Sequence, residues 1–205
     1  TVSIMVFSKP FRISVLVILF ILISIVVLAS NRLSSSLPML DGEVLSAELG
    51  SEVSLHRDKQ GIPTIIAKSR PDTAFALGFV HAQERLFQMD LLRKNSAGEL
   101  SELFGKLAVK HDSKIRLHQF RKRGQLAIAQ LPIKHLKVME AYRDGVNAGL
   151  KDLDRKPFEY SLLGVEPSPW VNEDSLLSLY SMYLDLQPQW GESERSLAVM
   201  KEQLP

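Results

Sequence analysis

The stretch from residue 78 to residue 105 carries polar side chains that could do chemistry, in a segment whose pattern is that of a largely buried helix. At 100° per residue, the apolar side chains form one broad stripe made of Phe75, Phe79, Ala82, Leu86 and Met89, widened by Ala76, Val80, Phe87 and Leu91. Gln83, Asp90 and Arg93 point into the middle of this stripe. Because an unpaired buried polar group costs about 1–3 kcal/mol, these three side chains need partners. The residues alone favour a buried structural network over an active site.

No catalytic motif accompanies these residues in the sequence. It contains no Gly-Xaa-Ser-Xaa-Gly elbow, no phosphate-cradling glycine loop and no His-Glu-Xaa-Xaa-His zinc helix. His81 is the best-placed histidine, and we interpret it as a helix-surface or hydrogen-bonded residue rather than a base or a metal ligand.

Two carboxylates near the end of the sequence form a weak candidate for a metal site. Glu192 and Glu194 follow a loop that contains Gln187, Pro188 and Gln189. Carboxylates beside loop carbonyl groups are oxygen donors of the kind that calcium uses, but one or two of them cannot complete a shell of six or more oxygens. The alternative is a pair of solvated carboxylates at a helix start, where the helix dipole favours them.

Several elements are expected to position these residues. Alternation over 52–57, turn residues over 58–61 and a second run over 62–67 predict a β-hairpin, with Pro63 confined to an edge or irregular pair. A long helix is predicted over 71–95, followed by a break at 96–98 and a short helical segment over 99–104 that Gly105 ends.

Helices dominate the second half of the predicted fold. We expect helices over 112–130 and 133–150, then a loop that includes 162–164 and the proline corner at 167–170. Asn172 is a good N-cap for a helix that should end near Pro188, and a last helical piece follows Arg195. The fold class is therefore α+β, mostly helical with an N-terminal hairpin.

The N-terminal segment indicates export or membrane attachment. Lys9 and Arg12 precede an almost unbroken apolar run over 13–29, and polar residues follow it. The run could be a cleaved signal peptide or a retained anchor, and both place the rest of the chain outside the cytoplasm. We divide the 205 residues into a signal peptide or anchor over 1–32, a linker over 33–40 and a folded region over 41–205.

Composition excludes several function classes. A net charge of +2 argues against a dedicated nucleic-acid binder, and the basic run 121–123 is interpreted as a solvated helix face. The absence of cysteine excludes disulfides, zinc-thiolate sites and a cysteine nucleophile from this sequence.

Taken together, segments from about residue 40 to residue 200 resemble the penicillin acylase family of N-terminal nucleophile hydrolases. The matching residues are Arg57, Asp58, Gly61, Pro63, Ile65 and Ala67; Gly78, Phe79, Ala82, Gln83, Glu84, Arg85, Leu86, Gln88 and Met89; Arg93, Gly98, Glu102 and Gly105; Asp112 and Arg116; Ala141, Tyr142, Gly145, Val146 and Asn147; Pro167, Pro169, Trp170 and Asp174; Glu192 and Arg195.

This resemblance implies that the sequence is the α-chain region of an exported precursor that is cut into a small α chain and a larger β chain. The α chain supplies part of an αββα fold. The implied reaction is the hydrolysis of a small-molecule amide by a serine at the N-terminus of the β chain, with its own α-amino group as the base and an oxyanion hole stabilising the intermediate. The catalytic residues would then lie on the β chain, and this region alone would be inactive.

The resemblance also assigns roles to residues of this sequence. It implies that Glu192, or failing that Glu194, gives one carboxylate to a calcium site that the β chain completes. It places Met182, Asp185 and Leu186 in the acyl-binding pocket. Where penicillin G acylases carry an arginine and a phenylalanine, this sequence has Asp185 and Leu186, so an aliphatic acyl group, as in acyl-homoserine lactone acylases, is at least as plausible as an aromatic one.

Two hypotheses follow about partners. If a β chain is present, Gln83, Asp90 and Arg93 could form an inter-chain polar network with it. The alternative function is a membrane-anchored, non-catalytic helical interaction protein. Residues 40–205 on their own would then fold as a soluble monomer instead of exposing apolar surface.

Overall fold

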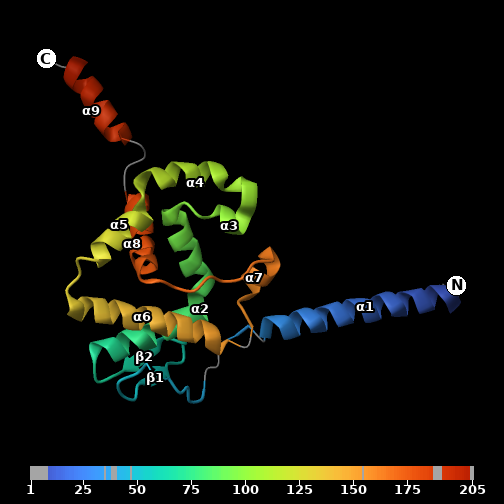
Figure 1. Ribbon diagram of the computed structural model, residues 1–205. Helices are drawn as coiled ribbons and strands as arrows, with labels where there is room; N and C mark the ends of the chain where they lie inside the picture. Colours follow the sequence, from blue (N-terminus) through green and yellow to red (C-terminus); the bar gives the residue numbers. More distant parts are fainter. Residues whose placement is uncertain are drawn as a thin grey trace.

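The computed structural model describes residues 9–34, 36–37, 41–46, 48–153, 155–186 and 191–203, with the side chains of 9–12, 32 and 192 excepted. The described elements, in chain order, are α1 (Lys9–Ser34), β1 (Ser54–Arg57), β2 (Pro63–Ile66), α2 (Arg70–Ala97), α3 (Ser101–Phe104), η1 (Gly105–Leu107), α4 (Val109–Ile115), η2 (Arg116–His118), α5 (Phe120–Ile128), α6 (Ile133–Asp152), α7 (Phe158–Leu163), α8 (Asn172–Leu186) and α9 (Glu192–Gln203). Figure 1 shows a helical body around α2, with the hairpin at one end. The predicted α+β class is confirmed.

Helix α2 is the element against which β2, α4, α5, α6 and α8 pack. Ser69 caps its N-terminus by accepting a hydrogen bond from the Asp72 amide at 3.1 Å, and Gly98 ends it in the left-handed conformation at φ 69°. Its buried side chains include the three polar residues predicted for its apolar stripe, Gln83, Asp90 and Arg93. Ala82 and Leu86 of α2 form a hydrophobic core with Val146, Tyr160 and Trp170.

Helix α6 approaches α2 so closely that the two backbones touch. A Cβ atom added at Gly145 would lie 1.9 Å from the carbonyl oxygen of Phe75, and one added at Gly78 would lie 2.2 Å from that of Tyr142. Only glycine fits such a contact, because any other residue would need the backbones to separate. The pair therefore sets a fixed spacing on which the helical body is built.

The hairpin is present as predicted, with slightly shorter strands. Strands β1 and β2 are antiparallel, and Pro63 pairs with Arg57 at the end of the ladder, where a missing amide costs least. The Asp58 carboxylate accepts hydrogen bonds from the amides of Gln60 and Ile62, both at 2.9 Å, which fixes the turn. Arg57 binds Glu84 at 2.8 Å and ties the hairpin to α2.

The region predicted to be helical over 112–130 is largely helical, but it is divided into separate helices by a break at Gln119. This residue has a left-handed backbone with φ 52°, and it separates α4 and η2 from α5. The tertiary contacts before the break account for it. Asp112 accepts hydrogen bonds from the amides of Leu100 and Ser101, and Arg116 donates to the carbonyl of Gly98 at 2.8 Å, so this turn is held against the end of α2.

Two further predictions about the second half need correction. Part of the predicted loop is helix α7. Asn172 does not cap α8, because its Oδ1 atom has no hydrogen-bond partner among the described residues. Asp174, in the first turn of α8, instead accepts a hydrogen bond from the amide of Val171, just before the helix, at 2.9 Å.

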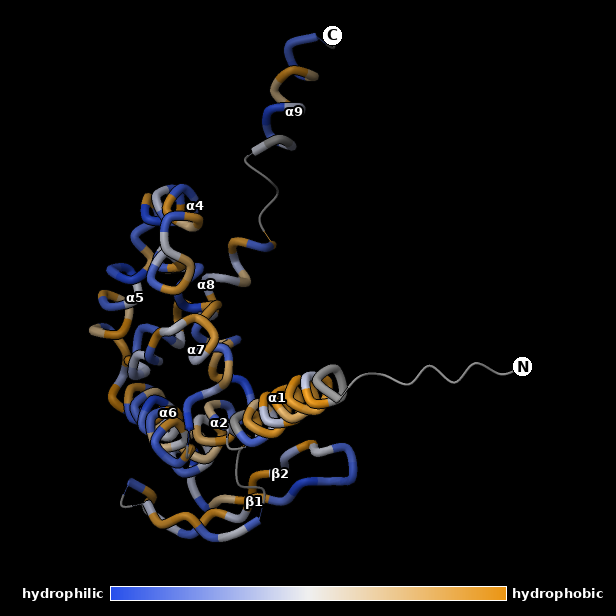
Figure 2. Tube along the Cα trace, turned by 90° about the vertical axis from the view of Figure 1, so that its right-hand side faces the viewer, coloured by the Kyte–Doolittle hydropathy of each residue, from blue (hydrophilic) through white to orange (hydrophobic). Residues whose placement is uncertain are grey.

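Helix α1 extends away from the body as an isolated rod, and α9 projects from the opposite end (Figures 1 and 2). The segment Ile13–Asn31 within α1 is long and apolar enough to cross a membrane, and none of it is buried against the body. This helix fits the signal peptide or membrane anchor predicted from the sequence. The predicted helix end near Pro188 lies outside the described residues, as does part of the predicted 33–40 linker.

Candidate functional site

The polar centre of the molecule is the Arg93 guanidinium, which is buried and paired with two carboxylates. Its Nε atom donates to Asp90 at 2.7 Å, and its Nη1 atom donates to Asp174 at 2.5 Å. All three side chains are at most 4% exposed. The guanidinium also lies over the Trp170 ring, 4.8 Å from its centroid. Burial alone would lower the pKa of Arg93, but the Asp174 and Asp90 carboxylates raise it, so the charge is retained.

Backbone groups complete the hydrogen bonds of this guanidinium. Arg93 donates to the carbonyl oxygens of Ser168 and Pro169 at 2.8 and 3.0 Å, which fixes the proline corner against α2. The Tyr160 hydroxyl donates to Asp90 at 3.0 Å, and burial together with the Asp90 charge raises the pKa of that hydroxyl. A buried ion pair is stable only when its remaining hydrogen-bonding capacity is met, as it is here.

Arg121 extends the network from α2 and α8 to α5. It binds Glu99 at 2.6 Å and Asp174 at 3.1 Å, and the Glu99 hydrogen bond is the main cause that raises its pKa. The interpretation of 121–123 as a solvated face is therefore wrong for Arg121, although Lys122 and Arg123 are exposed. In the sequence, nothing distinguishes the ion-paired Arg121 from its two exposed basic neighbours.

The buried network predicted on α2 is present, and the three side chains have partners within this chain, so an inter-chain network is not needed to satisfy them. Gln83 donates to Asp152 of α6 at 2.9 Å, and Asp90 and Arg93 bind Tyr160, Asp174 and the proline corner. The partners all lie within this chain, because α6, α7 and α8 fold back onto α2 from positions 69 to 81 residues away.

The C-terminal half of α8 presents a surface that the described residues leave uncovered. Its inner face is held by Ser181, which accepts a hydrogen bond from Asn95 at 3.3 Å, and by Tyr180, whose ring stacks on Phe120 at 4.6 Å. The outer face carries an apolar stripe, which we call the α8 stripe, made of Leu179, Met182, Tyr183 and Leu186, each at least half exposed.

The three residues that the resemblance assigned to a pocket lie together on this outer face. Met182 and Leu186 belong to the α8 stripe, and Asp185 is exposed beside them. They share a face because they are three and four residues apart on a helix. An apolar strip with one flanking carboxylate can bind an apolar group or a partner.

The described histidines offer no catalytic constellation. His81 shares a hydrogen bond of 2.9 Å with the Tyr142 hydroxyl, and burial lowers the pKa of its ring. Burial raises the pKa of Tyr142 to about 12. His111 binds Asn95 at 2.7 Å. These contacts agree with the structural interpretation of His81.

The predicted metal ligands lie at the start of α9. Glu194 is exposed, whereas the side chain of Glu192 and the preceding loop 187–190 lie outside the described residues. Within the described part of the chain, no three His, Cys, Asp or Glu side chains are grouped so that they could hold a metal ion. A calcium ion bound here would therefore take most of its oxygens from elsewhere.

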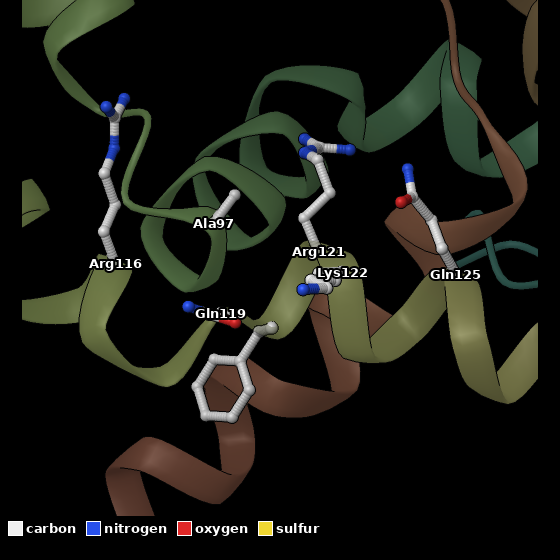
Figure 3. Close-up of a pocket in the computed structure, with 7 residues that line it drawn as sticks. Ala97, Arg116, Gln119, Arg121, Lys122 and Gln125 are labelled. Carbon is white, nitrogen blue, oxygen red and sulfur yellow. The ribbon is translucent and has the colours of Figure 1, made fainter.

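A shallow pocket of about 390 Å³ opens between the end of α2 and the start of α5 (Figure 3). It is lined by Ala97, Arg116, Gln119, Phe120, Arg121, Lys122 and Gln125. The side chains of Arg116 and Arg121 point toward the end of α2 on either side of Ala97 (Figure 3). There Arg116 binds the carbonyl of Gly98 and Arg121 binds Glu99. The pocket thus lies around the framework that holds α2, α5 and α8 together, and it does not include the α8 stripe.

Comparison with known proteins gives a consistent set of relatives. The penicillin amidase family profile matches residues 52–205. The chain is 36% identical over 169 residues to the penicillin acylase 2 proenzyme of Pseudomonas sp. strain SE83, covering 82% of this chain and 22% of that protein. It is 31% identical over 173 residues to the acyl-homoserine lactone acylase QuiP of Pseudomonas aeruginosa, covering 84% of this chain and 20% of that protein.

A solved structure has a similar fold over most of the chain. The thermostable penicillin G acylase from Alcaligenes faecalis matches with a TM-score of 0.61 and 25% identity, over 75% of this chain and 85% of the matched chain. The present chain spans about a fifth of the length of the curated relatives it matches.

Replacing Asp174 should test how far the fold depends on the Arg93 pair. Asp174→Ala leaves Arg93 buried with one carboxylate fewer, so we expect the free energy of unfolding in urea to fall by about 3–5 kcal/mol. The control is Asp144→Ala, which removes the partially exposed pair with Arg143 and should cost about 1 kcal/mol or less. Equal losses in the two variants would contradict a central role for the buried pair.

Proposed function

This chain belongs to the penicillin amidase family, and we propose that it forms the α-chain part of an exported acylase that hydrolyses amides of hydrophobic acids. One contrast carries the proposal. The matched region is 85% of a chain in the solved penicillin G acylase but only 22% of the penicillin acylase 2 proenzyme. This contrast supports a precursor whose first region becomes a separate chain after cleavage, and the apolar helix α1 supports its export.

In this proposal the reaction centre belongs to a β chain that this chain supports and completes. A serine at the new N-terminus of the β chain attacks the amide carbonyl, while its α-amino group takes the hydroxyl proton and returns it to the leaving amine. Hydrogen-bond donors stabilise the oxyanion. The role of the present chain is to place α8 against that centre, because the Arg93 network fixes one face of α8 and leaves the other open.

The acyl-binding surface is proposed to include Met182, Asp185 and Leu186. Met182 and Leu186 are 53% and 72% exposed, so they are free to cover an apolar acyl chain once the site is assembled. Leu186 has no ring to fill the space, which favours an aliphatic acyl group. The names of the relatives include both penicillin acylases and acyl-homoserine lactone acylases, and they are compatible with this substrate class.

A calcium ion is proposed to bind at the junction between the two chains, with Glu192 as the ligand from this chain and Glu194 as its substitute. Calcium takes six to eight oxygen ligands, so a single carboxylate from α9 fits a site that the β chain completes. The ion would join α9 to the β chain and thereby stabilise the assembled enzyme.

The full-length protein tests the proposed precursor. We expect the purified protein to separate under denaturing conditions into a small chain containing these residues and a larger chain that begins with serine, as read by mass spectrometry. Replacing that serine by alanine should abolish hydrolysis of an N-acyl amide. The proposal would be refuted by a reading frame that contains neither such a serine nor a long downstream domain. A full-length protein that stays uncut and inactive would also refute it.

The pocket assignment is tested by adding a ring at Leu186. In the assembled enzyme, Leu186→Phe should shift the ratio of kcat/KM values from aliphatic toward aromatic acyl groups by about tenfold, which corresponds to roughly 1.4 kcal/mol of differential binding. Leu126→Phe makes the same change at an exposed leucine of α5 and should leave the ratio unchanged. If Leu186→Phe behaves like this control, Leu186 does not contact the acyl group.

The calcium assignment is tested by a matched pair of carboxylate deletions. Glu192→Ala should lower the calcium content of the assembled enzyme after dialysis more than Glu194→Ala does, because only the first removes a ligand. Elemental analysis by mass spectrometry provides the measurement. The same metal content in both variants and the parent would exclude α9 as a source of ligands.

A further inference from the structure

Helix α7 has an exposed apolar face although its inner side is firmly held. Tyr160 is fully buried and donates to Asp90, and its ring also packs edge-on against Phe87 at 5.3 Å. On the outer side, Phe158 and Leu162 are 49% and 81% exposed, with the exposed Ser161 between them. We call Phe158, Ser161 and Leu162 the α7 face. Because Tyr160 holds α7 in one orientation, the side chains of the α7 face stay on the outside of the body.

The α7 face lies beside the end of the apolar helix α1. Leu33, near the C-terminus of α1, lines a small cavity of about 70 Å³ together with Arg155, Lys156, Phe158 and Ser161. In Figure 1, α7 is on the side of the body from which α1 projects, and Figure 2 looks onto that side. The apolar surface of α1 and the α7 face are therefore neighbours.

The length of α1 sets the depth of the α7 face relative to a bilayer. The apolar segment Ile13–Asn31 has 19 residues. At 1.5 Å per residue it is about 28 Å long, close to the ~30 Å hydrocarbon core of a bilayer. Leu33 is two residues past Asn31, which places it about 3 Å beyond the hydrocarbon edge. Because α7 lines the same cavity as Leu33, an α1 that spans the bilayer would place the α7 face at the depth of the lipid headgroups.

The charged groups around the α7 face suit phospholipid headgroups in general. Arg155 is exposed and has no hydrogen-bond or ion-pair partner among the described residues, and a guanidinium is a donor group suited to a phosphate. Lys156 is already paired with Glu166 and bonded to the Val165 carbonyl, and the half-buried Glu159 adds a negative charge. The local charges nearly cancel, so the face should bind the phosphate that all phospholipids share and should not depend on anionic lipids.

We propose that α1 remains attached to the exported protein and that the α7 face rests on the bilayer surface. Phe158 and Leu162 enter the boundary between headgroups and acyl chains, as the apolar side of an interfacial helix does, and Arg155 binds a lipid phosphate. The body is then held at two points, the transmembrane helix and α7, which fixes its orientation on the membrane. This inference does not depend on the acylase activity.

A fluorescent label on the α7 face of the full-length protein tests this orientation. Ser161→Cys places a bimane label between Phe158 and Leu162, and Gln130→Cys places the same label in the exposed turn after α5. Helix α5 lies on the side of the body away from α1 (Figure 1). In vesicles of phosphatidylethanolamine and phosphatidylglycerol, lipids with a nitroxide near the headgroup should quench the label at 161 several-fold more strongly than the label at 130. Vesicles of phosphatidylcholine should give the same difference.

A second variant separates docking from mere proximity to α1. Adding Phe158→Ser and Leu162→Ser to the 161-labelled protein should reduce quenching to nearly the level at 130, while circular dichroism stays unchanged. Three results would overturn the proposal. The first is equal quenching at 161 and 130 in the parent protein, and the second is a mature membrane-bound protein whose mass lacks α1. The third is a label at 161 that is shielded from aqueous iodide but not quenched by lipid, which would mean that protein covers the α7 face.

Discussion

The buried pair between Arg93 and Asp174 is the interaction on which the rest of the described fold depends. Arg93 is on α2 and Asp174 is 81 residues later on α8, and the same guanidinium holds the proline corner that precedes α8. A charge at 4% exposure is stable only while every partner is present. The pair therefore specifies one docking position for α8, whereas apolar contacts alone would tolerate small shifts along the helix axis.

This constraint explains why α8 can be well ordered and still incompletely covered. Asp174 fixes its first turn, Ser181 and Tyr180 hold its inner face, and the α8 stripe remains open along the outer face. An apolar stripe on a helix that cannot rotate presents the same side chains to whatever binds it. Preorganisation of this kind lowers the ordering cost of binding, which is what a chain that contributes to a shared site requires.

The parts of this structure that could be predicted from sequence are those governed by local pattern. The period of the apolar residues gave α2 and showed that Gln83, Asp90 and Arg93 would be buried, and Asp58 with Gly61 gave the hairpin turn. The partners of the buried residues could not be predicted, because Asp152, Tyr160 and Asp174 reach α2 only through the tertiary fold. The break at Gln119 was missed for the same reason, since it depends on Arg116 binding the end of α2. Met182, Asp185 and Leu186 were named only through the resemblance, because an exposed leucine or methionine has no periodic signal that separates a binding surface from an ordinary one.

The open surfaces of the chain are placed at different ends of one rigid unit. Tyr160 of α7 and Asp174 of α8 both bind the Asp90–Arg93 pair, so the α7 face and the α8 stripe are held by the same charges. The close contact of Gly78 and Gly145 with backbone carbonyls keeps α2 and α6 from sliding. If the α7 face contacts a bilayer, the distance and orientation of the α8 stripe relative to the bilayer surface are then fixed by this rigid unit. No additional contact between α8 and the membrane is required. The same network that stabilises the fold would thereby determine how an assembled site is presented relative to the membrane.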